Sequence, residues 1–584
     1  MKLTLNKRRA GIFVPLFALR TENDLGVGDT GALREMVDRC KEWGVTVLQI
    51  LPINETSADN SPYMAISAMA IEPTTLEIKP NIIPGLSLED YDALVTSDVL
   101  NQIRQGPVNY RIVKPLKLNL LERAFQRFLK SRAKATISLR QRFEGFCLRE
   151  AAWLESYTLF RFIGEQQGHF CWEIWPEEHR TIKDAELFFK NLPSAEAKTA
   201  SQRRKFYAYV QWVAFEQWIA LKNHAHAQGV QLMGDIPFGI NRQSADVWAH
   251  PQMFDLHWSG GAPPEPFFKP DKFTEIWGQN WGIPIYNWTE MEKTRFDWWR
   301  RRVDCVSRLF HLFRIDHVLG FYRIYSFPWQ PSRNQEFADK TKEQVLAEHG
   351  ALPRFLPGDD NKPEEAKINQ AQGEKLLKMV IEAAGDSTVI AEDLGTVPNY
   401  MRPSLTSLGI PGFKIPLFER NESSREFILP EDYPVLSVTT LGTHDHDTAV
   451  ARWHKRWEMW HEREKRLKQG TLTPEFDREA HESFWDLYRA QRFARLDDQA
   501  PIPNYEPIVR EAILHRLLEA KSFLAIIMIT DLLGIDIRFN VPGPVAETNW
   551  SERLPYTLHQ LHNDPSLEPI RAFLKRAITA TNRI

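Results

Sequence analysis

Short apolar segments alternate with amphipathic, helix-like segments along most of the chain, and this alternation is the strongest constraint on its fold. The apolar segments have the length and composition of buried strands. There are eight of them: Gly11–Phe17, Val45–Leu51, Gln231–Pro237, Leu312–Asp316, Thr388–Ala391, Phe413–Leu417, Ser437–Thr440 and Phe523–Thr530. Helix-like segments lead into several of these strands: Gly31–Trp43, Tyr207–Gln228, Arg295–Arg308 and Glu374–Ala384. The alternation favours parallel strands with right-handed crossovers, and eight such units predict an α/β fold, the closed (β/α)8 TIM barrel.

An open, doubly wound sheet is the alternative architecture, but no glycine-rich nucleotide-binding turn follows any early strand. We therefore predict one barrel domain across residues 1–584, because barrels often form a single domain despite their length. Three stretches do not fit simple crossovers. We expect insertions there: a helical one at about 87–200, an irregular or helical one at about 330–373, and a helical one at about 453–495.

The charge balance argues against highly charged partners. The formal net charge is −3 with 26% charged residues, so we expect neither a nucleic-acid nor a membrane partner. No apolar run approaches the roughly 20 residues of a membrane span. The apolar stretch Gly11–Leu19 imitates a secretion signal, but it contains Pro15 and lacks a small-residue cleavage site. The cysteines are too scattered for a metal or redox motif and predict a reduced, cytoplasmic protein: Cys40, Cys147, Cys171 and Cys305.

Three of the apolar segments end on or near a carboxylate: Asp316 in LFRIDH, Glu392 in TVIAEDLG and Asp445 in TTLGTHDHD. These belong to the fourth, fifth and seventh predicted strands. In a (β/α)8 barrel the C-terminal ends of the strands share one rim, where the chemistry takes place. Three carboxylates that converge in a cleft suit glycosyl chemistry, in which one attacks, one passes a proton and one stabilises the transition state.

The neighbours of two carboxylates suggest separate roles. Arg314 precedes Asp316 by two positions, so both side chains point to the same face of the strand. A cation there favours the ionised carboxylate that a nucleophile requires. Glu392 follows an apolar strand and lies near other carboxylates, surroundings that raise the pKa of a carboxyl group as a general acid requires.

A metal site is the main alternative use of the third segment. His444, Asp445, His446 and Asp447 are all possible ligands, and His317 supplies one more. Adjacent side chains diverge, however, and no partner His pair at helical spacing lies nearby in the sequence. We therefore expect no metal and no other cofactor.

A series of longer motifs occurs in order along nearly the whole chain. They are DLGVGDTG at Asp24–Gly31, LQILPIN at Leu48–Asn54, SPYMAISAMAIEP at Ser61–Pro73, GDIPFGINRQSADVWAHPQMF at Gly234–Phe254, GAPPEPF at Gly261–Phe267, GQNWGIPIYNW at Gly278–Trp288, FRIDHVLGF at Phe313–Phe321, AEDLG at Ala391–Gly395, GTHDHDT at Gly442–Thr448, and RFNVPG at Arg538–Gly543 followed by Asn549 and Trp550. Taken together, they resemble the 4-α-glucanotransferase family (amylomaltase or disproportionating enzyme, glycoside hydrolase family 77).

The resemblance implies a retaining double displacement on α-1,4-glucans without a cofactor. Asp316 is then the nucleophile, Glu392 the general acid and base, and Asp445 the stabiliser of the transition state. Tyr63 is implied to stack near the reacting glucose unit. The other residues implied to bind the donor are Asp235, Gln279, Trp281, Arg314, His444 and Asn540. The implied partners are malto-oligosaccharides, maltose, glucose or an α-glucan polymer.

Two departures from the family pattern stand out. The family commonly has asparagine where this chain has Ile283, and THDND where this chain has His446. We expect both positions to border the cleft and to affect donor length or acceptor preference. An α-1,4-glucan hydrolase on the same site is the near alternative, and a non-catalytic glucan-binding protein is the alternative from another class.

Overall fold

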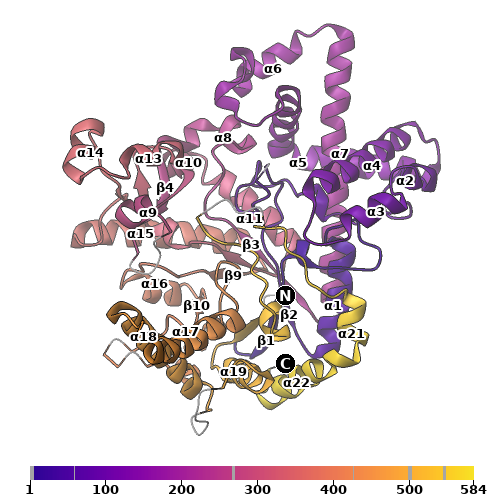
Figure 1. Ribbon diagram of the computed structural model, residues 1–584. Coiled ribbons are helices and arrows are strands. Elements are labelled where there is room, and N and C mark those ends of the chain that lie inside the picture. The colour runs from indigo at the N-terminus through magenta and orange to yellow at the C-terminus, as the bar shows by residue number, and fades with distance from the viewer. Residues whose placement is uncertain are drawn as a thin grey trace.

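The computed structural model describes residues 5–57, 59–265, 270–421, 423–424, 426–496, 503–543 and 548–583. Eight parallel strands form its centre: β1 Arg9–Phe13, β2 Val47–Gln49, β3 Gln231–Ile236, β6 Leu312–Ile315, β9 Thr388–Ala391, β10 Gly412–Lys414, β11 Ser437–Thr440 and β12 Leu524–Met528. They close into a barrel in the order β1-β12-β11-β10-β9-β6-β3-β2 (Figure 1). Each strand overlaps one predicted segment, so the predicted (β/α)8 barrel is confirmed.

The helices predicted to precede strands are also present: α1 Thr30–Trp43, α7 Ser194–Ala227, α11 Asp297–Leu309 and α15 Pro363–Ala384. They pack on the strands that follow them. Local sequence explains the bounds of α1. The side chain of Asp29 accepts hydrogen bonds from the first-turn amides of Gly31 and Ala32, and Gly44 ends the helix in the left-handed region at φ 79°. The C-terminal part adds α16 Met401–Ser407, α19 Pro507–Glu519, α20 Ile529–Leu533, α21 Leu558–Asn563 and α22 Glu568–Ala580.

A second sheet, which the sequence did not suggest, lies beside the barrel. Its strands are β4 Phe254–Ala262, β5 Gln279–Tyr286, β7 Ile324–Phe327 and β8 Arg354–Leu356, paired antiparallel in the order β5-β4-β7-β8. β4 and β5 carry glycines and polar residues, and their pairing is interrupted by register shifts. Such strands lack the continuous apolar character that identified the barrel strands. Short helices surround this sheet: α8 Ala245–Ala249, α9 Lys272–Trp277, α10 Trp288–Lys293 and α12 Leu319–Tyr322.

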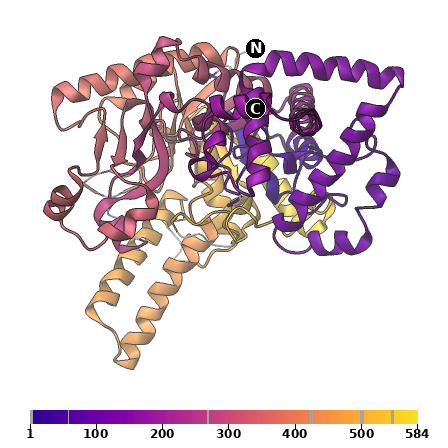
Figure 2. The ribbon, with the colours of Figure 1, turned by 90° about the horizontal axis from the view of Figure 1, so that it is seen from above.

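The three stretches predicted as insertions differ in structure. Residues 87–200 form α2 Leu88–Asp92, α3 Ser97–Ile103, α4 Tyr110–Lys130, α5 Lys134–Gln167, α6 Ile182–Lys190 and the start of α7. Residues 330–373 contain α13 Asn334–Phe337, α14 Lys342–His349, β8 and the start of α15. Residues 453–495 lie in the hairpin of α17 Ala449–Gln469 and α18 Pro474–Phe493, which projects from the body of the molecule (orange in Figure 2). We propose that the chain is one barrel domain carrying these stretches as insertions.

Strand register brings distant residues to one level of the barrel. Asp235 in β3 pairs with Arg314 in β6, and Ile315 in β6 pairs with Ala391 in β9. Asp316 and Glu392 each follow directly after these strands, at their C-terminal ends. None of the helices in the described ranges is both long enough and apolar enough to cross a membrane.

Candidate active site

Arg314 connects three carboxylates at the C-terminal end of the barrel. Its Nη1 atom lies 2.5 Å from Oδ2 of Asp235, and its Nη2 atom lies 2.6 Å from Oδ1 of Asp316. The same Nη2 atom is 3.8 Å from Oε2 of Glu392. Arg314 and Asp235 are buried, whereas 29% of the Asp316 side chain is exposed. One buried guanidinium therefore orients a carboxylate that remains accessible to solvent.

Glu392 is held by two backbone amides. The N–H of His317 donates to Oε2 at 2.7 Å, and the N–H of Leu394 donates to Oε1 at 2.9 Å. Burial raises the pKa of Glu392 to about 8, and the neighbouring Asp316 adds to the rise. Arg314 and the two amides act in the opposite direction but do not outweigh burial. The carboxyl group is thus protonated at neutral pH, the state that a general acid needs.

Asp445 lies in the loop after β11, and 40% of its side chain is exposed. The amide of Asn540 donates to Oδ1 at 2.5 Å, and Nε2 of His444 lies 3.3 Å from Oδ2. Burial alone would raise the pKa of Asp445, but His444 and the hydrogen bond from Asn540 outweigh it and the pKa is lowered. Burial also lowers the pKa of His444. Asp445 is therefore a carboxylate, which can stabilise a developing positive charge.

Aromatic rings form the wall between β1 and the Asp445 loop. The Tyr63 ring stacks on His444 with centroids 5.1 Å apart and an angle of 14° between the planes. The Tyr63 hydroxyl donates to Oδ2 of Asp235 at 2.8 Å. Trp550 packs on both rings, at 5.8 Å from Tyr63 and 5.6 Å from His444. The wall is tied to the carboxylate cluster through Asp235.

Trp281 lies at the start of β5 and joins the carboxylate cluster through His317, the neighbour of Asp316 in the chain. Its ring meets the His317 ring edge-on at 4.8 Å, and its Nε1 atom lies 3.3 Å from Oε1 of Gln279. All ten residues singled out from the sequence therefore belong to one connected group, through direct contacts or through His317.

Three further residues contribute that the sequence analysis did not assign to the site. His317 adopts a positive φ of 45°, which is rare for a non-glycine residue, and its amide contacts Glu392. Arg538 donates to the main-chain oxygen of Asp445 at 2.5 Å and to the main-chain oxygen of Asn540 at 2.8 Å. Trp550 follows the last of the ordered motifs. For His317 and Arg538, the available signal was their position in the motifs FRIDH and RFN, next to assigned residues.

The two departures from the family pattern differ in surroundings. Ile283 is buried in the hydrophobic core, and its effect on donor length or acceptor preference stays a prediction. His446 lies beside Asp445, but its Nδ1 atom contacts the Thr443 hydroxyl at 2.8 Å and its ring packs on Phe418. It thus holds the turn of the loop. Within the described residues, no three His, Cys, Asp or Glu side chains are arranged to hold a metal ion.

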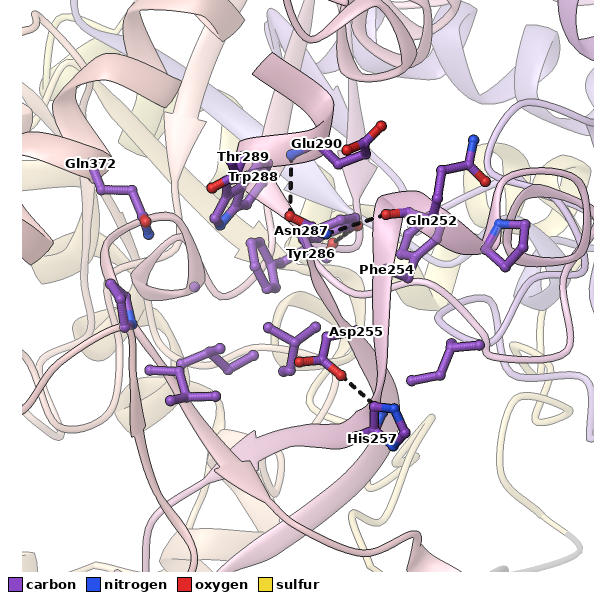
Figure 3. A pocket seen from close by; sticks show the side chains of 18 residues that line it. Gln252, Phe254, Asp255, His257, Tyr286, Asn287, Trp288, Thr289, Glu290 and Gln372 are labelled. Carbon is purple, nitrogen blue, oxygen red and sulfur yellow. Dashed lines mark hydrogen bonds between the residues drawn. The ribbon is translucent and has the colours of Figure 1, made fainter. Parts of the chain in front are cut away.

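A separate cavity of about 770 Å³ lies between the second sheet and α10 (Figure 3). Asp255, Tyr286 and Trp288 are among the residues that line it, and none of the carboxylate cluster does. The Tyr286 hydroxyl donates to the carbonyl of Phe238, whose ring lies 6.4 Å from His317. The cavity therefore lies near the carboxylate cluster but shares no lining residue with it.

Comparisons with known proteins identify relatives that cover most of the chain. The family model described as 4-alpha-glucanotransferase matches residues 14–559. A 4-alpha-glucanotransferase of Chlamydia pneumoniae is 31% identical over 96% of this chain and 94% of its own length. One of Thermus thermophilus is 31% identical over 91% of each chain. The solved structure of an amylomaltase from Streptococcus agalactiae in complex with acarbose is 25% identical, with a TM-score of 0.71 over 99% of this chain and 100% of that one.

Proposed function

The chain belongs to the 4-alpha-glucanotransferase family, glycoside hydrolase family 77, and we propose that Asp316, Glu392 and Asp445 carry out its reaction. The protein is a 4-alpha-glucanotransferase, which moves α-1,4-glucan segments from a donor to the 4-hydroxyl group of an acceptor glucan or glucose. The reaction is a retaining double displacement through a covalent glucosyl-enzyme. The observation that carries the assignment of residues is the contact of one Arg314 nitrogen with both Asp316 and Glu392.

The spacing of the two carboxylates supports the retaining course. Oδ1 of Asp316 and Oε2 of Glu392 lie 2.6 and 3.8 Å from the same Arg314 nitrogen. Their separation cannot exceed the sum of these two distances. That limit accommodates the roughly 5–5.5 Å that separates the two carboxyl groups of retaining enzymes. The spacing leaves room for a direct attack by Asp316.

In the first step Asp316 attacks the anomeric carbon of the donor. Arg314 binds its Oδ1 atom, and within the described part of the chain no hydrogen bond reaches Oδ2, so Oδ2 is the oxygen that attacks. The bond from the anomeric carbon to the glycosidic oxygen breaks as the new ester bond forms. The electron pair leaves on the glycosidic oxygen, which takes the proton of Glu392.

In the second step the roles reverse. Glu392, now a carboxylate, accepts the proton of the acceptor 4-hydroxyl group while that oxygen attacks the anomeric carbon. The ester to Asp316 breaks, and the carboxylate is restored. The two backbone hydrogen bonds on Glu392 stabilise its charged form between the two steps. Arg314 keeps both side chains in place throughout.

Asp445 stabilises the positive charge that develops on the sugar ring between these steps. Tyr63 and Trp281 supply aromatic rings beside Arg314 and His317, and His444 and Asn540 fix the carboxylate of Asp445. We also assign Asp235, Gln279 and Arg314 to donor binding.

Malto-oligosaccharides, maltose, glucose and α-glucan polymers are the substrates that this site fits. They are uncharged and rich in hydroxyl groups, which suits a chain with a net charge of −3. We place the protein in the cytoplasm. The described residues contain no disulfide, and the four cysteines are free thiols, which agrees with a reducing compartment.

Product analysis on maltotriose tests the proposal. We expect glucose together with a ladder of longer chains and no net gain of reducing ends. A net gain of reducing ends would identify a hydrolase on the same site. If binding occurs without any product, the protein is a glucan-binding protein and the proposed catalytic roles are wrong.

A further inference from the structure

A long groove leads away from the proposed active site along α17. It has a volume of about 1210 Å³. Nine of its lining residues lie on α17: Ala451, His454, Lys455, Trp457, Glu458, Met459, His461, Glu462 and Lys465. Most of these follow the three-and-four spacing of one helix face. Phe476 at the start of α18 lines the far part, and the helix pair carrying the groove projects from the body (orange in Figure 2).

The inner end of the groove touches the residues that hold Asp445. Arg538 and Asp447 line the groove, and Nη1 of Arg538 lies 2.5 Å from Oδ1 of Asp447. Arg538 also donates to the main-chain oxygens of Asp445 and Asn540. The inner end of the groove therefore borders the residues that hold the Asp445 loop, although Asp445 itself does not line the groove. A chain lying in the groove points one end toward this loop.

The lining is nearly balanced in charge. Lys455, Lys465 and Arg538 face Asp447, Glu458, Glu462 and Asp536. A strongly charged polymer would meet repulsion from one set or the other, so this balance disfavours nucleic acids and acidic peptides. Charged side chains make strong hydrogen bonds to neutral hydroxyl groups. The lining thus suits an uncharged, hydroxyl-rich chain.

The groove also contains a flat aromatic platform. The rings of Trp457 and His461 stack with centroids 3.7 Å apart and planes 27° apart. A hydrogen bond of 2.8 Å between Nδ1 of His461 and the carbonyl of Trp457 fixes the pair. The opposite side of the hairpin is occupied by packing between the helices, where Trp460 meets Phe484 at 4.5 Å. Flat rings of this kind match the apolar C–H face of a pyranose ring.

We propose that this groove binds a segment of polymeric α-glucan several glucose units away from the reacting bond. The proposal rests on the proposed function and deepens it, because it makes long glucans the preferred substrates. From Ala451 to Lys465 the lining spans about 21 Å at 1.5 Å per residue of helix. A trisaccharide held at the carboxylate cluster does not fill that length, whereas a polymer does.

The test compares Trp457→Ala with the parent on maltotriose and on long-chain amylose. We expect the KM for amylose to rise about tenfold, because the platform is lost, while the KM for maltotriose changes by less than twofold. Trp457→Phe keeps a flat ring and should recover most of the amylose affinity. Trp485→Ala is the matched control, because Trp485 lies on the same hairpin, is 49% exposed and does not line the groove.

Three outcomes overturn the proposal: unchanged KM values in Trp457→Ala, an equal rise for both substrates, or the same amylose defect in Trp485→Ala. Thermal unfolding of each variant checks that the hairpin is intact. Amylose binding is measured separately by affinity electrophoresis of Asp316→Asn with and without Trp457→Ala. Amylose binding that depends on Trp457, together with no products from the parent enzyme, would overturn the proposed function and leave the groove supported.

Discussion

The Nη2 atom of Arg314 lies 2.6 Å from Oδ1 of Asp316, two positions further along the same strand end. The other terminal nitrogen of the same guanidinium lies 2.5 Å from Oδ2 of Asp235 on the neighbouring strand. The register between β3 and β6 places Asp235 directly beside Arg314, so the barrel itself sets this geometry. Arg314 therefore has two functions: it stabilises the strand ends through Asp235, and it orients the proposed nucleophile Asp316.

Replacement of Arg314 by methionine should reduce both stability and activity. Burial raises the pKa of Asp235 and Arg314 opposes that rise, so loss of the cation leaves a buried carboxylate without its partner. We expect the free energy of unfolding to fall by about 3–5 kcal/mol. Chemical denaturation measures this change.

The second variant Arg314→Met/Asp235→Asn separates the two effects. Removing the charge of Asp235 should restore much of the lost stability, because an uncharged amide costs less to bury. Activity should stay low, because Asp316 still lacks its partner. Recovery of both properties together would contradict a positioning role for Arg314.

Asp316→Asn should abolish turnover without unfolding the protein. An amide cannot form the covalent glucosyl-enzyme, so kcat/KM on maltotriose should fall by about 10⁴-fold or more. The matched control is Asp304→Asn on α11, a 65% exposed carboxylate that pairs with Arg308 on the surface and should leave kcat/KM unchanged. A rate in Asp316→Asn close to that of the control would rule out Asp316 as the nucleophile.

The raised pKa of Glu392 predicts the alkaline side of the pH profile. Its carboxyl group must be protonated for the first step, so kcat/KM should fall as the pH rises through about 8. Glu392→Gln should be inactive at every pH with natural glucans. A profile that stays flat to well above pH 8 would contradict the assignment.

The same shift predicts a change in stability. The folded pKa of about 8 lies above the ordinary value of 4.5, so the contribution of Glu392 to stability is complete below 4.5 and is lost as the pH rises to about 8. The parent should therefore lose stability between pH 4.5 and 8, so the melting temperature of Glu392→Gln should rise relative to that of the parent across this range. A constant difference across this range would indicate that the pKa is not raised.

Chelation should leave transfer intact. Asn540 holds the Asp445 carboxylate, and the Nδ1 atom of His446 contacts Thr443. The Asp445 and His446 side chains are therefore not arranged to bind one metal ion together. We expect the initial rate on maltotriose in excess EDTA to equal the rate in buffer. A loss of activity that Ca²⁺ or Zn²⁺ restores would revive the metal alternative.

The barrel could be predicted from the sequence because its strands are buried on both faces. Leu524–Met528 is apolar throughout and Leu312–Ile315 is apolar except for Arg314, and all residues of both segments are buried. The second sheet had no comparable signal. β4 contains Gly260, Gly261 and His257, and β8 has only three residues. Its strands are defined by tertiary pairing, which overrides their weak local preference.

The candidate site was predictable where it depends on strand ends and only partly where it depends on loops. Asp316 and Glu392 follow directly after strands, so their convergence is a consequence of the barrel. Asn540 could be predicted only from its motif. The hydrogen bonds of Arg538 to the main chain of the Asp445 loop depend on the folded loop, so the amino-acid composition does not predict them. Ile283 lies two positions after Trp281 in the sequence, and its burial in the core could not be predicted from the motif.

Asn540 offers the sharpest test of the role of Asp445. Its amide donates to Oδ1 of Asp445 at 2.5 Å, and this hydrogen bond helps to lower the pKa of the carboxyl group. In Asn540→Ala the carboxylate loses a fixed orientation that matters most in the transition state, so kcat should fall by about 10–100-fold with a much smaller change in KM. The pKa of Asp445 should rise, and activity should then be lost at a higher pH than in the parent as the solution is acidified. Asn540→Asp should move this acidic limb further, because a second carboxylate disfavours the charge on Asp445. Steady-state kinetics across the pH range measure both effects, and a merely structural role for Asn540 would reduce activity without moving the limb.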